Sequence, residues 1–235
     1  EGEEASILAF TDGKNIMLLE SSQDHKAVYD GDKGPNTGGM GAYSPAPVIT
    51  PDIEDTIIKD ILIPVIHGMN FEGCPYSGIL YAGLMIQNGE PSVLEFNVRL
   101  GDPETQPLLV RLKSDLVDLI EATANGTLDR ENIEWNPDPA VCVVMASGGY
   151  PGTYEKGMEI SGIEDAETGT CQVFHAGTEL KDGKTVTSGG RVLGVTATGS
   201  GIKQAISNAY AGVEKVSFTN ACYRSDIGAK ALNRT

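Results

Sequence analysis

The 235-residue chain has few basic residues and no long apolar run. Its 17 Lys and Arg are outnumbered by 33 Asp and Glu, which gives a formal net charge of −16. A nucleic-acid backbone or an acidic membrane surface needs a basic footprint, so we expect neither as a partner. The longest apolar runs, 61–66 and 141–146, are too short to span a bilayer, and we expect no signal peptide. The charge does not exclude a nucleotide, because local N–H groups, Arg, Lys and metal ions can still hold phosphates.

The sequence is also poor in cysteine and in clustered metal ligands. Its 4 cysteines are widely spaced and form no C-x-x-C pair; they are Cys74, Cys142, Cys171 and Cys222. In a chain of this length, that spacing favours reduced thiols in a soluble, cytoplasmic protein over a disulfide framework. No His or Cys cluster has zinc spacing, and no nucleophile elbow indicates a Ser-His-Asp or Cys-His set.

The stretch 92–107, SVLEFNVRLGDPETQP, carries the most chemistry. Alternate side chains of a strand share a face, which predicts one polar and one apolar side. The polar side would carry Val93, Glu95, Asn97 and Arg99, and the apolar side, packed on a core, Leu94, Phe96, Val98 and Leu100. A carboxylate and an amide oxygen two residues apart suit Mg²⁺, which completes its shell with water and phosphates. An ordinary strand with a solvated polar face remains the alternative, although it does not explain the Asn, the Arg and the charged turn together.

Turn and capping signals predict an α+β protein with two parts. Asp12-Gly13 and Asn88-Gly89 are typical of hairpins, here joining strands at 5–11 and 15–20 and at 79–86 and 91–98. Thr50 and Pro51 begin a helix that Pro64 should kink or interrupt. Three more helices are expected, one at 105–112, one that begins at a Ser114 cap and ends at Gly126, and one at 202–216. Three more strands are expected at 140–146, 171–177 and 191–198. The polar stretch 128–139 reads as a linker between a domain at 1–127 and a small β-rich domain at 140–235.

Two further motifs lie in residues 23–47, a stretch without period that is either functional or disordered. The triplet Asp24, His25 and Lys26 suits a polar substrate or a solvated turn. The following Gly-rich segment, which includes Gly38, Gly39, Met40 and Gly41, suits an anion cradle or a flexible turn. It is not a P-loop, because no Gly-Lys-Ser/Thr ends it. The segments Gly148-Gly149-Tyr150-Pro151 and Gly189-Gly190-Arg191 favour turns over sites.

Taken together, these segments resemble the phosphoribosylamine–glycine ligase (glycinamide ribonucleotide synthetase) family of the ATP-grasp superfamily. The resemblance covers the whole chain and rests, in order, on QDHK, GDKGPNTGGMGAYSPAP, YAGLM, LEFNVRLGDPETQP, VVMASGGYPG, VFHAGT and GGRVLGVTA. It implies the second half of an ATP-grasp domain, an antiparallel sheet with helices, followed by a small β-rich domain. It also implies ATP-dependent joining of glycine to 5-phosphoribosylamine through a glycyl phosphate, giving glycinamide ribonucleotide, ADP and phosphate in purine biosynthesis.

The resemblance further implies roles for individual residues. Glu95 and Asn97 would be ligands of Mg²⁺ or Mn²⁺ bridging the phosphates of ATP, and Glu4 would contact its ribose. Arg99 would stabilise charge on the transferring phosphoryl group, with Asp102 as a second catalytic residue of the signature turn. Substrate contacts would come from Glu104, the triplet at 24–26 and the loop at 38–41.

Three positions depart from the family pattern: Leu100 replaces Phe, Ala27 replaces a frequent Arg, and the strand at 79–86 lacks the carboxylate of many ATP-grasp enzymes. Family chains are roughly twice as long, and the sequence starts abruptly at Glu1. We therefore expect a part of the enzyme whose partner is a missing N-terminal half, inactive alone. Alternatives are a non-catalytic domain of a multifunctional purine enzyme, or another purine-pathway ATP-grasp ligase.

Overall fold

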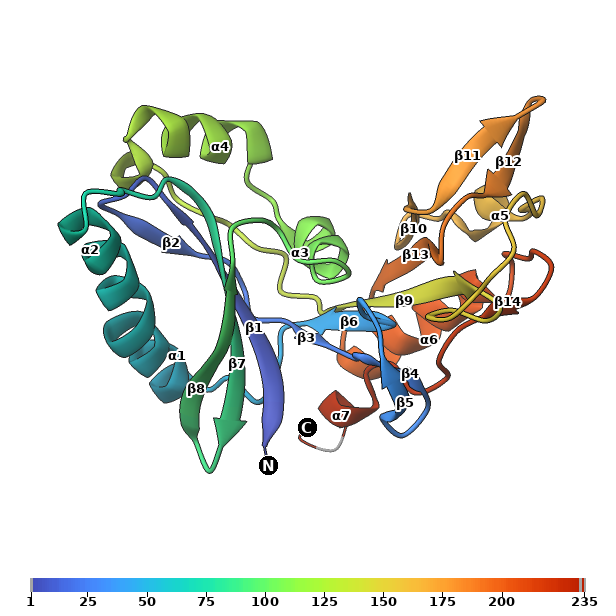
Figure 1. Cartoon of the computed structure of the whole chain (residues 1–235), viewed down its shortest axis with the longest axis horizontal. Helices are drawn as coiled ribbons and strands as arrows, with labels where there is room; N and C mark the ends of the chain where they lie inside the picture. The colour runs from blue at the N-terminus through green and yellow to red at the C-terminus, as the bar shows by residue number, and fades with distance from the viewer. Residues whose placement is uncertain (1, 233, 235) are drawn as a thin grey trace. The chain divides into compact units, whose positions relative to one another are not determined.

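The computed structural model describes residues 2–232 and 234, and these form two compact units (Figure 1). The first unit comprises the described residues up to Gln23 with Pro45–Gly101 and Leu112–Pro137. The second comprises Asp24–Ser44, Asp102–Arg111 and the described residues from Asp138 onward. Both combine antiparallel strands with helices, which confirms the α+β class. The sequential division at 1–127 and 140–235, with its 128–139 linker, stays a prediction, and Glu1 lies outside the described residues.

The first unit contains a four-stranded antiparallel sheet in the order β2-β1-β7-β8. Its strands are β1 (Glu3–Thr11), β2 (Ile16–Leu18), β7 (Gly78–Gln87) and β8 (Glu90–Asn97). The Asp12 carboxylate accepts hydrogen bonds from the N–H groups of Lys14 and Asn15, which closes the turn between β1 and β2. Asn88 and Gly89 both have positive φ, as the two-residue turn between β7 and β8 requires. Both predicted hairpins are confirmed.

One face of this sheet is covered by a continuous helical segment. It runs through α1 (Pro51–Thr56), a π-helical turn (Ile57–Leu62) and α2 (Ile63–Phe71), with the Thr50 side chain capping its start. Apolar residues of the segment pack on Ala5, Ile7 and Ala9 of β1 and on Leu80, Ala82, Leu84 and Ile86 of β7. The predicted kink or interruption at Pro64 takes the form of a local widening, in which the N–H of Ile63 donates to the carbonyl of Ile58. A wider turn accommodates a residue that has no N–H of its own.

Helix α4 (Leu116–Asn125) contacts β1 and β7, and a 3-10 turn (Leu128–Arg130) follows it. Its cap is Asp115, whose side chain accepts from the N–H of Val117 at 2.8 Å. The predicted cap, Ser114, is wrong: its hydroxyl accepts from the N–H of Glu134 instead. Gly126 ends the helix with φ 70°, as expected.

The second unit is built on a six-stranded sheet in the order β10-β13-β9-β6-β3, with β14 added beside β9. These strands are β10 (Cys171–His175), β13 (Arg191–Thr198), β9 (Ala140–Ser147), β6 (Gly41–Ser44), β3 (Gln23–Asp24) and β14 (Ala221–Cys222). Helix α6 (Ile202–Val213) packs through Ala205, Ala209 and Val213 on three valines of the sheet, Val141 and Val143 of β9 and Val195 of β13. Helix α3 (Thr105–Arg111) lies on the other face, where a Cβ on Gly194 would come within 3.1 Å of Cys142 Sγ.

Residues 23–44 are the main correction to the predicted fold. They contain β3, β4 (Ala27–Tyr29), β5 (Lys33–Asn36) and β6 rather than an irregular loop. The strand β6 pairs with β9, about a hundred residues away, at Gly41–Val143 and Ser44–Ala140. Local periodicity cannot reveal such a partner. The remaining elements are α5 (Ile163–Ala166), β11 (Thr178–Lys181), β12 (Lys184–Thr187) and α7 (Ala229–Leu232), and none of the described helices has the length and apolarity to cross a membrane.

Candidate functional site

Glu95 and Asn97 lie side by side on the edge strand β8. They pair with Gly83 and Tyr81 of β7, so the register places both on the same face of the sheet. The Asn97 amide nitrogen donates to Oε1 of Glu95 at 3.2 Å. This bond turns the amide nitrogen of Asn97, and not its amide oxygen, toward Glu95. The two predicted ligands therefore lie together on one sheet face, and their role as a metal site stays a prediction.

The predicted apolar face of this strand is wrong. Gly83 pairs with Glu95 but Leu84 pairs with Val93, so Leu94 is an extra, bulged residue. The bulge moves Val93 to the helix-covered face, opposite Glu95. Leu94, Phe96 and Val98 are 49%, 41% and 71% exposed rather than packed on a core. Alternation counted along one strand misses a bulge, because a bulge is defined by its partner strand.

Glu95 and Asn97 could provide only part of the ligand shell of a divalent cation. Among the described residues, no group of three or more His, Cys, Asp or Glu side chains could hold a metal ion. Glu95 and Asn97 would supply at most two hard oxygen ligands, and Mg²⁺ or Mn²⁺ would take the rest from phosphates and water. This donor set suits a metal that arrives with a nucleotide.

Glu4 of β1 shares the face of Glu95 and Asn97. It pairs with Met85, and Ser6 pairs with Gly83, which in turn pairs with Glu95. Strands β1 and β8 are separated by β7, and Glu4 is offset along the strands by two residues from Glu95 and by four from Asn97. The distance between backbone positions on this face is therefore about 12 Å from Glu4 to Glu95 and about 17 Å from Glu4 to Asn97. The remaining site candidate of this unit, Arg99, is exposed beyond β8, and its Nη1 donates to the carbonyl of Leu100 at 2.9 Å.

In the second unit, the glycine-rich loop is held tightly by its own surroundings. The N–H of Gly38 donates to the Tyr150 hydroxyl at 3.1 Å, and that of Gly39 donates to Thr37 Oγ1 at 2.9 Å. The N–H of Met40 donates to the carbonyl of His25 at 2.8 Å. Gly39 has φ 115°, and a Cβ there would lie 2.4 Å from a Pro103 ring carbon. The loop is therefore rigid, and these three N–H groups do not form an open anion cradle.

Arg191 joins this loop to Asp102. Its Nη1 donates to the carbonyls of Gly38 at 2.6 Å, Gly39 at 3.3 Å and Asp102 at 2.8 Å. Its Nη2 forms an ion pair with the Asp102 carboxylate at 2.9 Å. The sequence interpretation took 189–191 as a turn and missed this residue and Tyr150. The available signal was their place in two of the family motifs, GGRVLGVTA and VVMASGGYPG.

The triplet at 24–26 is not a solvated turn. Asp24 and His25 are 8% and 1% exposed, and the N–H of His25 donates to the carbonyl of Gly41 at 2.9 Å. The His25 ring packs edge-on against Tyr43, and neither ring nitrogen has a hydrogen-bond partner within the described residues. Burial lowers the pKa of His25 to about 4, and the positive charges of Arg224 and Lys230 act in the same direction. His25 is therefore a neutral imidazole at pH 7.

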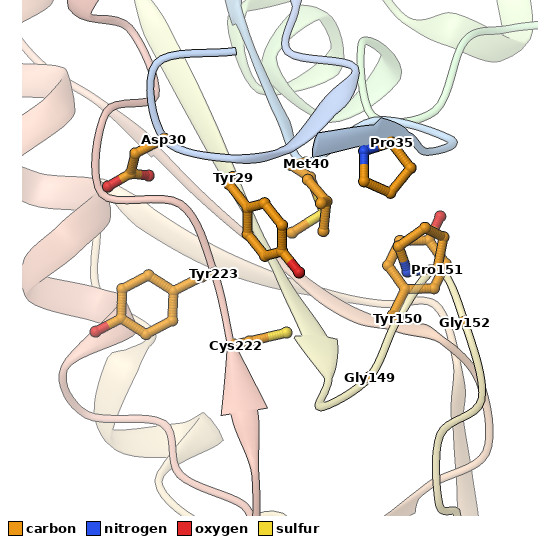
Figure 2. Close-up of a pocket in the computed structure, with 11 residues that line it drawn as sticks. Tyr29, Asp30, Pro35, Met40, Gly149, Tyr150, Pro151, Gly152, Cys222 and Tyr223 are labelled. Carbon is orange, nitrogen blue, oxygen red and sulfur yellow. The ribbon is translucent and has the colours of Figure 1, made fainter. Parts of the chain in front are cut away.

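The remaining residues of this unit lie close in sequence to these. The Lys26 carbonyl accepts from Thr37, which ties the triplet to the loop, and Glu104 is buried at the start of α3. A pocket of about 640 Å³ lies beside the loop (Figure 2). Its described lining residues include Tyr29, Met40, Tyr150 and Cys222 but no Arg or Lys. Of the predicted site residues, only Met40 reaches it.

The site candidates thus fall into two sets, each within one unit. The first unit brings Glu4, Glu95 and Asn97 to one sheet face and carries Arg99 just beyond it. The second unit brings together the triplet at 24–26, the loop at 38–41 and Asp102, with Glu104 on the following turn.

Comparisons with known proteins identify the family of the chain. The model of the phosphoribosylglycinamide synthetase ATP-grasp (A) domain matches residues 1–105, and that of the C domain matches 140–230. The phosphoribosylamine–glycine ligase of Allochromatium vinosum is 54% identical over 234 residues, covering 99% of this chain and 55% of the relative. That of Pseudomonas aeruginosa is 52% identical over 235 residues, covering 100% and 55%.

A solved structure gives the same result. The phosphoribosylamine–glycine ligase of Thermotoga maritima is 39% identical, with a TM-score of 0.86, over 96% of this chain and 56% of that one. The chain spans about half the length of the curated relatives it matches. The two family models together match well over half of the chain, and both belong to one enzyme. The chain therefore belongs to the phosphoribosylglycinamide synthetase family.

Proposed function

We propose that this chain supplies the metal site and part of the substrate site of a phosphoribosylamine–glycine ligase. The reaction would join glycine to 5-phosphoribosylamine with conversion of ATP to ADP and phosphate. The observation that carries the proposal is the Glu95–Asn97 pair, on the same sheet face as Glu4. A nucleotide lying across this face would have its ribose near Glu4 and its phosphates near the pair.

The chemistry consists of two transfers. A glycine carboxylate oxygen attacks the terminal phosphorus of ATP, ADP leaves, and a glycyl phosphate forms. The amine of phosphoribosylamine then attacks the glycyl carbonyl carbon, phosphate leaves and the amine loses a proton. Mg²⁺ or Mn²⁺, when bound, neutralises charge on the ATP phosphates. Glu95 and Asn97 would hold that ion, and Arg99 would stabilise charge on the transferring phosphoryl group.

In the second unit, Asp102 and the loop would act as a preformed pair. Arg191 fixes the Asp102 carboxylate relative to the carbonyls of Gly38 and Gly39. We propose that Asp102 orients a reacting group. We also propose that glycine or phosphoribosylamine is bound by the loop at 38–41 and by Asp24, His25, Lys26 and Glu104. Pre-positioned groups lower the entropic cost of bringing two substrates together.

The whole activity would require more than the present chain. The curated relatives are about twice as long, so we propose that the rest of the family chain completes the nucleotide site. We also propose a cytoplasmic location, which is supported by the 4 cysteines being free.

The decisive experiment measures ADP formation by the natural polypeptide that carries this sequence, with glycine, with formate and without either. We expect glycine- and phosphoribosylamine-dependent ADP release, lost by at least about a hundredfold in Glu95→Gln. Glu90→Gln, on the same strand but at its exposed turn, is the matched control and should retain activity. Formate-dependent ADP release would favour the alternative purine ligase. Robust glycine-dependent turnover by the 235-residue chain alone would overturn the requirement for a further part.

A further inference from the structure

Arg224 is a buried guanidinium that connects two segments far apart in sequence. It is 1% exposed, although it lies only two residues after the short strand β14. Its Nε and Nη2 form a bidentate ion pair with Asp226, both at 2.7 Å. Its Nη1 donates to the carbonyl of Ala27 at 3.0 Å and to the Asp32 carboxylate at 2.9 Å. Ala27 directly follows Lys26, the last residue of the triplet.

The neighbours of Arg224 repeat the same connection. The N–H of Ser225 donates to the Asp30 carboxylate at 2.9 Å, and that of Gly31 donates to Asp226 at 2.8 Å. Lys230 forms a second ion pair with Asp32 at 2.8 Å. The segment 224–230 therefore holds the hairpin β4–β5, residues 27–36, from one side. That hairpin lies in sequence between the triplet at 24–26 and the loop at 38–41.

We propose that Arg224 is a positioning residue, which holds the β4–β5 hairpin so that the triplet and the glycine-rich loop keep their binding geometry. The C-terminal segment 224–230 would thus be part of the substrate-binding apparatus, although it contributes none of its own side chains to the ligand. The functional half of this inference rests on the proposed function of those two motifs. The structural half stands on the ion pairs alone.

Charge and burial explain why this connection has a functional consequence beyond folding. A buried guanidinium with two carboxylate partners keeps a fixed geometry, and removal of the guanidinium leaves both Asp226 and Asp32 without this cation. Four charged groups act on the buried His25 ring: Arg224 and Lys230 from the C-terminal segment, with Asp226, and Asp32 from the hairpin. A loosened hairpin would therefore change the electrostatic environment of a proposed substrate residue.

Two variants test the proposal in the natural polypeptide that carries this sequence. Arg224→Met removes the guanidinium and keeps an unbranched apolar stem. Asp32→Asn removes a single charge from a carboxylate that is 43% exposed, at a residue with φ 55° that asparagine also tolerates. Lys184→Met is the matched control, because it breaks an exposed ion pair with Glu159 at 2.8 Å in the same unit.

Hydrogen exchange and ligand binding give the readouts. In both test variants, we expect amide exchange in residues 24–41 to accelerate by at least about tenfold, with little change in β9 and β13. We expect the affinity for ribose 5-phosphate, the probe for the phosphoribosyl group, to fall at least about fivefold. The pKa of His25, followed by NMR, should rise by about one unit in Arg224→Met, because a nearby positive charge is lost. The control should change none of the three.

Each outcome decides a separate point. Unchanged exchange in 24–41 and an unchanged His25 titration in both test variants would overturn the proposal. If Arg224→Met loosens the whole unit, Asp32→Asn decides, since it leaves the buried guanidinium and Asp226 in place. If the unmodified chain does not bind ribose 5-phosphate, the proposed role of the two motifs fails. The exchange and titration data would still support or overturn the positioning role.

Discussion

His25 is buried and its ring nitrogens have no hydrogen-bond partner among the described residues, which predicts a specific loss of stability in mild acid. Burial lowers its pKa to about 4 in the folded chain, assisted by Arg224 and Lys230, whereas an unfolded histidine titrates near 6.5. Between these two values the unfolded state binds a proton that the folded state does not. The free energy of unfolding must therefore fall as the pH is lowered through this window. Above pH 6.5 both states are neutral and His25 causes no pH dependence.

The expected size follows from the two pKa values. Each unit of pKa difference corresponds to 1.36 kcal/mol, so the interval of about 2.5 units predicts a loss of about 3 kcal/mol by pH 4. The acid-sensitive carboxylates act at lower pH. The pKa of Asp12 is lowered to about 2 by its hydrogen bonds, which outweigh burial, and the pKa of Asp226 is lowered by Arg224. Their stabilising contributions are present above about pH 4 and are lost below it, which separates them from the window of His25.

Urea unfolding at steps between pH 7.5 and 4, compared with His25→Gln, measures this effect. We expect the difference between the two free energies of unfolding to be constant above pH 6.5. Between pH 6.5 and pH 4, the free energy of unfolding of the unmodified chain should fall by about 3 kcal/mol more than that of His25→Gln. His67→Gln is the control, because His67 is exposed and its substitution should leave the pH profile unchanged. Parallel profiles for the unmodified chain and His25→Gln, or an NMR titration of His25 near pH 6.5, would refute the reasoning.

Three shorter predictions address the remaining geometry. Gly39→Ala should lower the free energy of unfolding by about 2 kcal/mol or more in urea titrations, because φ is 115° and the new Cβ meets the ring of Pro103. Gly169→Ala is the control and should not lower it, because no atom lies within 4 Å of the Cβ it would add. Cys142 should resist iodoacetamide at pH 8 while exposed Cys74 reacts, since burial raises the pKa of Cys142 to about 12; labelling of Cys142 in the native chain, seen by mass spectrometry, would contradict this. Asp115→Ala should cost about 1 kcal/mol in thermal unfolding through loss of the helix cap, and a neutral result would reject the cap assignment.

Local signals explain which parts of the fold could be predicted. The hairpin at Asn88-Gly89 and the helix start at Thr50-Pro51 depend on the residues at the turn or cap itself, and both are confirmed. The bulge at Leu94 and the strand β6 depend on partner strands, and both were missed. Sequence alternation was right for Glu95 and Asn97 because both lie on the same side of the bulge.

The same distinction applies to the candidate site. Residue chemistry and spacing were enough to single out the Glu95–Asn97 pair. The interaction of Arg191 with Gly38 and Asp102 joins three separate sequence segments, and no spacing along the chain predicts it. The buried state of His25 was missed for a related reason, since a polar triplet beside a Gly-rich stretch resembles a solvated turn until its strand partners are known.

The electrostatics of the second unit constrain how an anionic substrate could bind. The chain has a net charge of −16, and two arginines of this unit already hold carboxylates and backbone carbonyls, Arg191 at the loop and Arg224 at the hairpin. The N–H groups of Gly38, Gly39 and Met40 are also engaged inside the protein. The loop therefore contributes shape and rigidity more than positive charge. Under the proposed function, the phosphate charge of a substrate bound in this unit would therefore be met by side chains such as Lys26 rather than by the loop N–H groups.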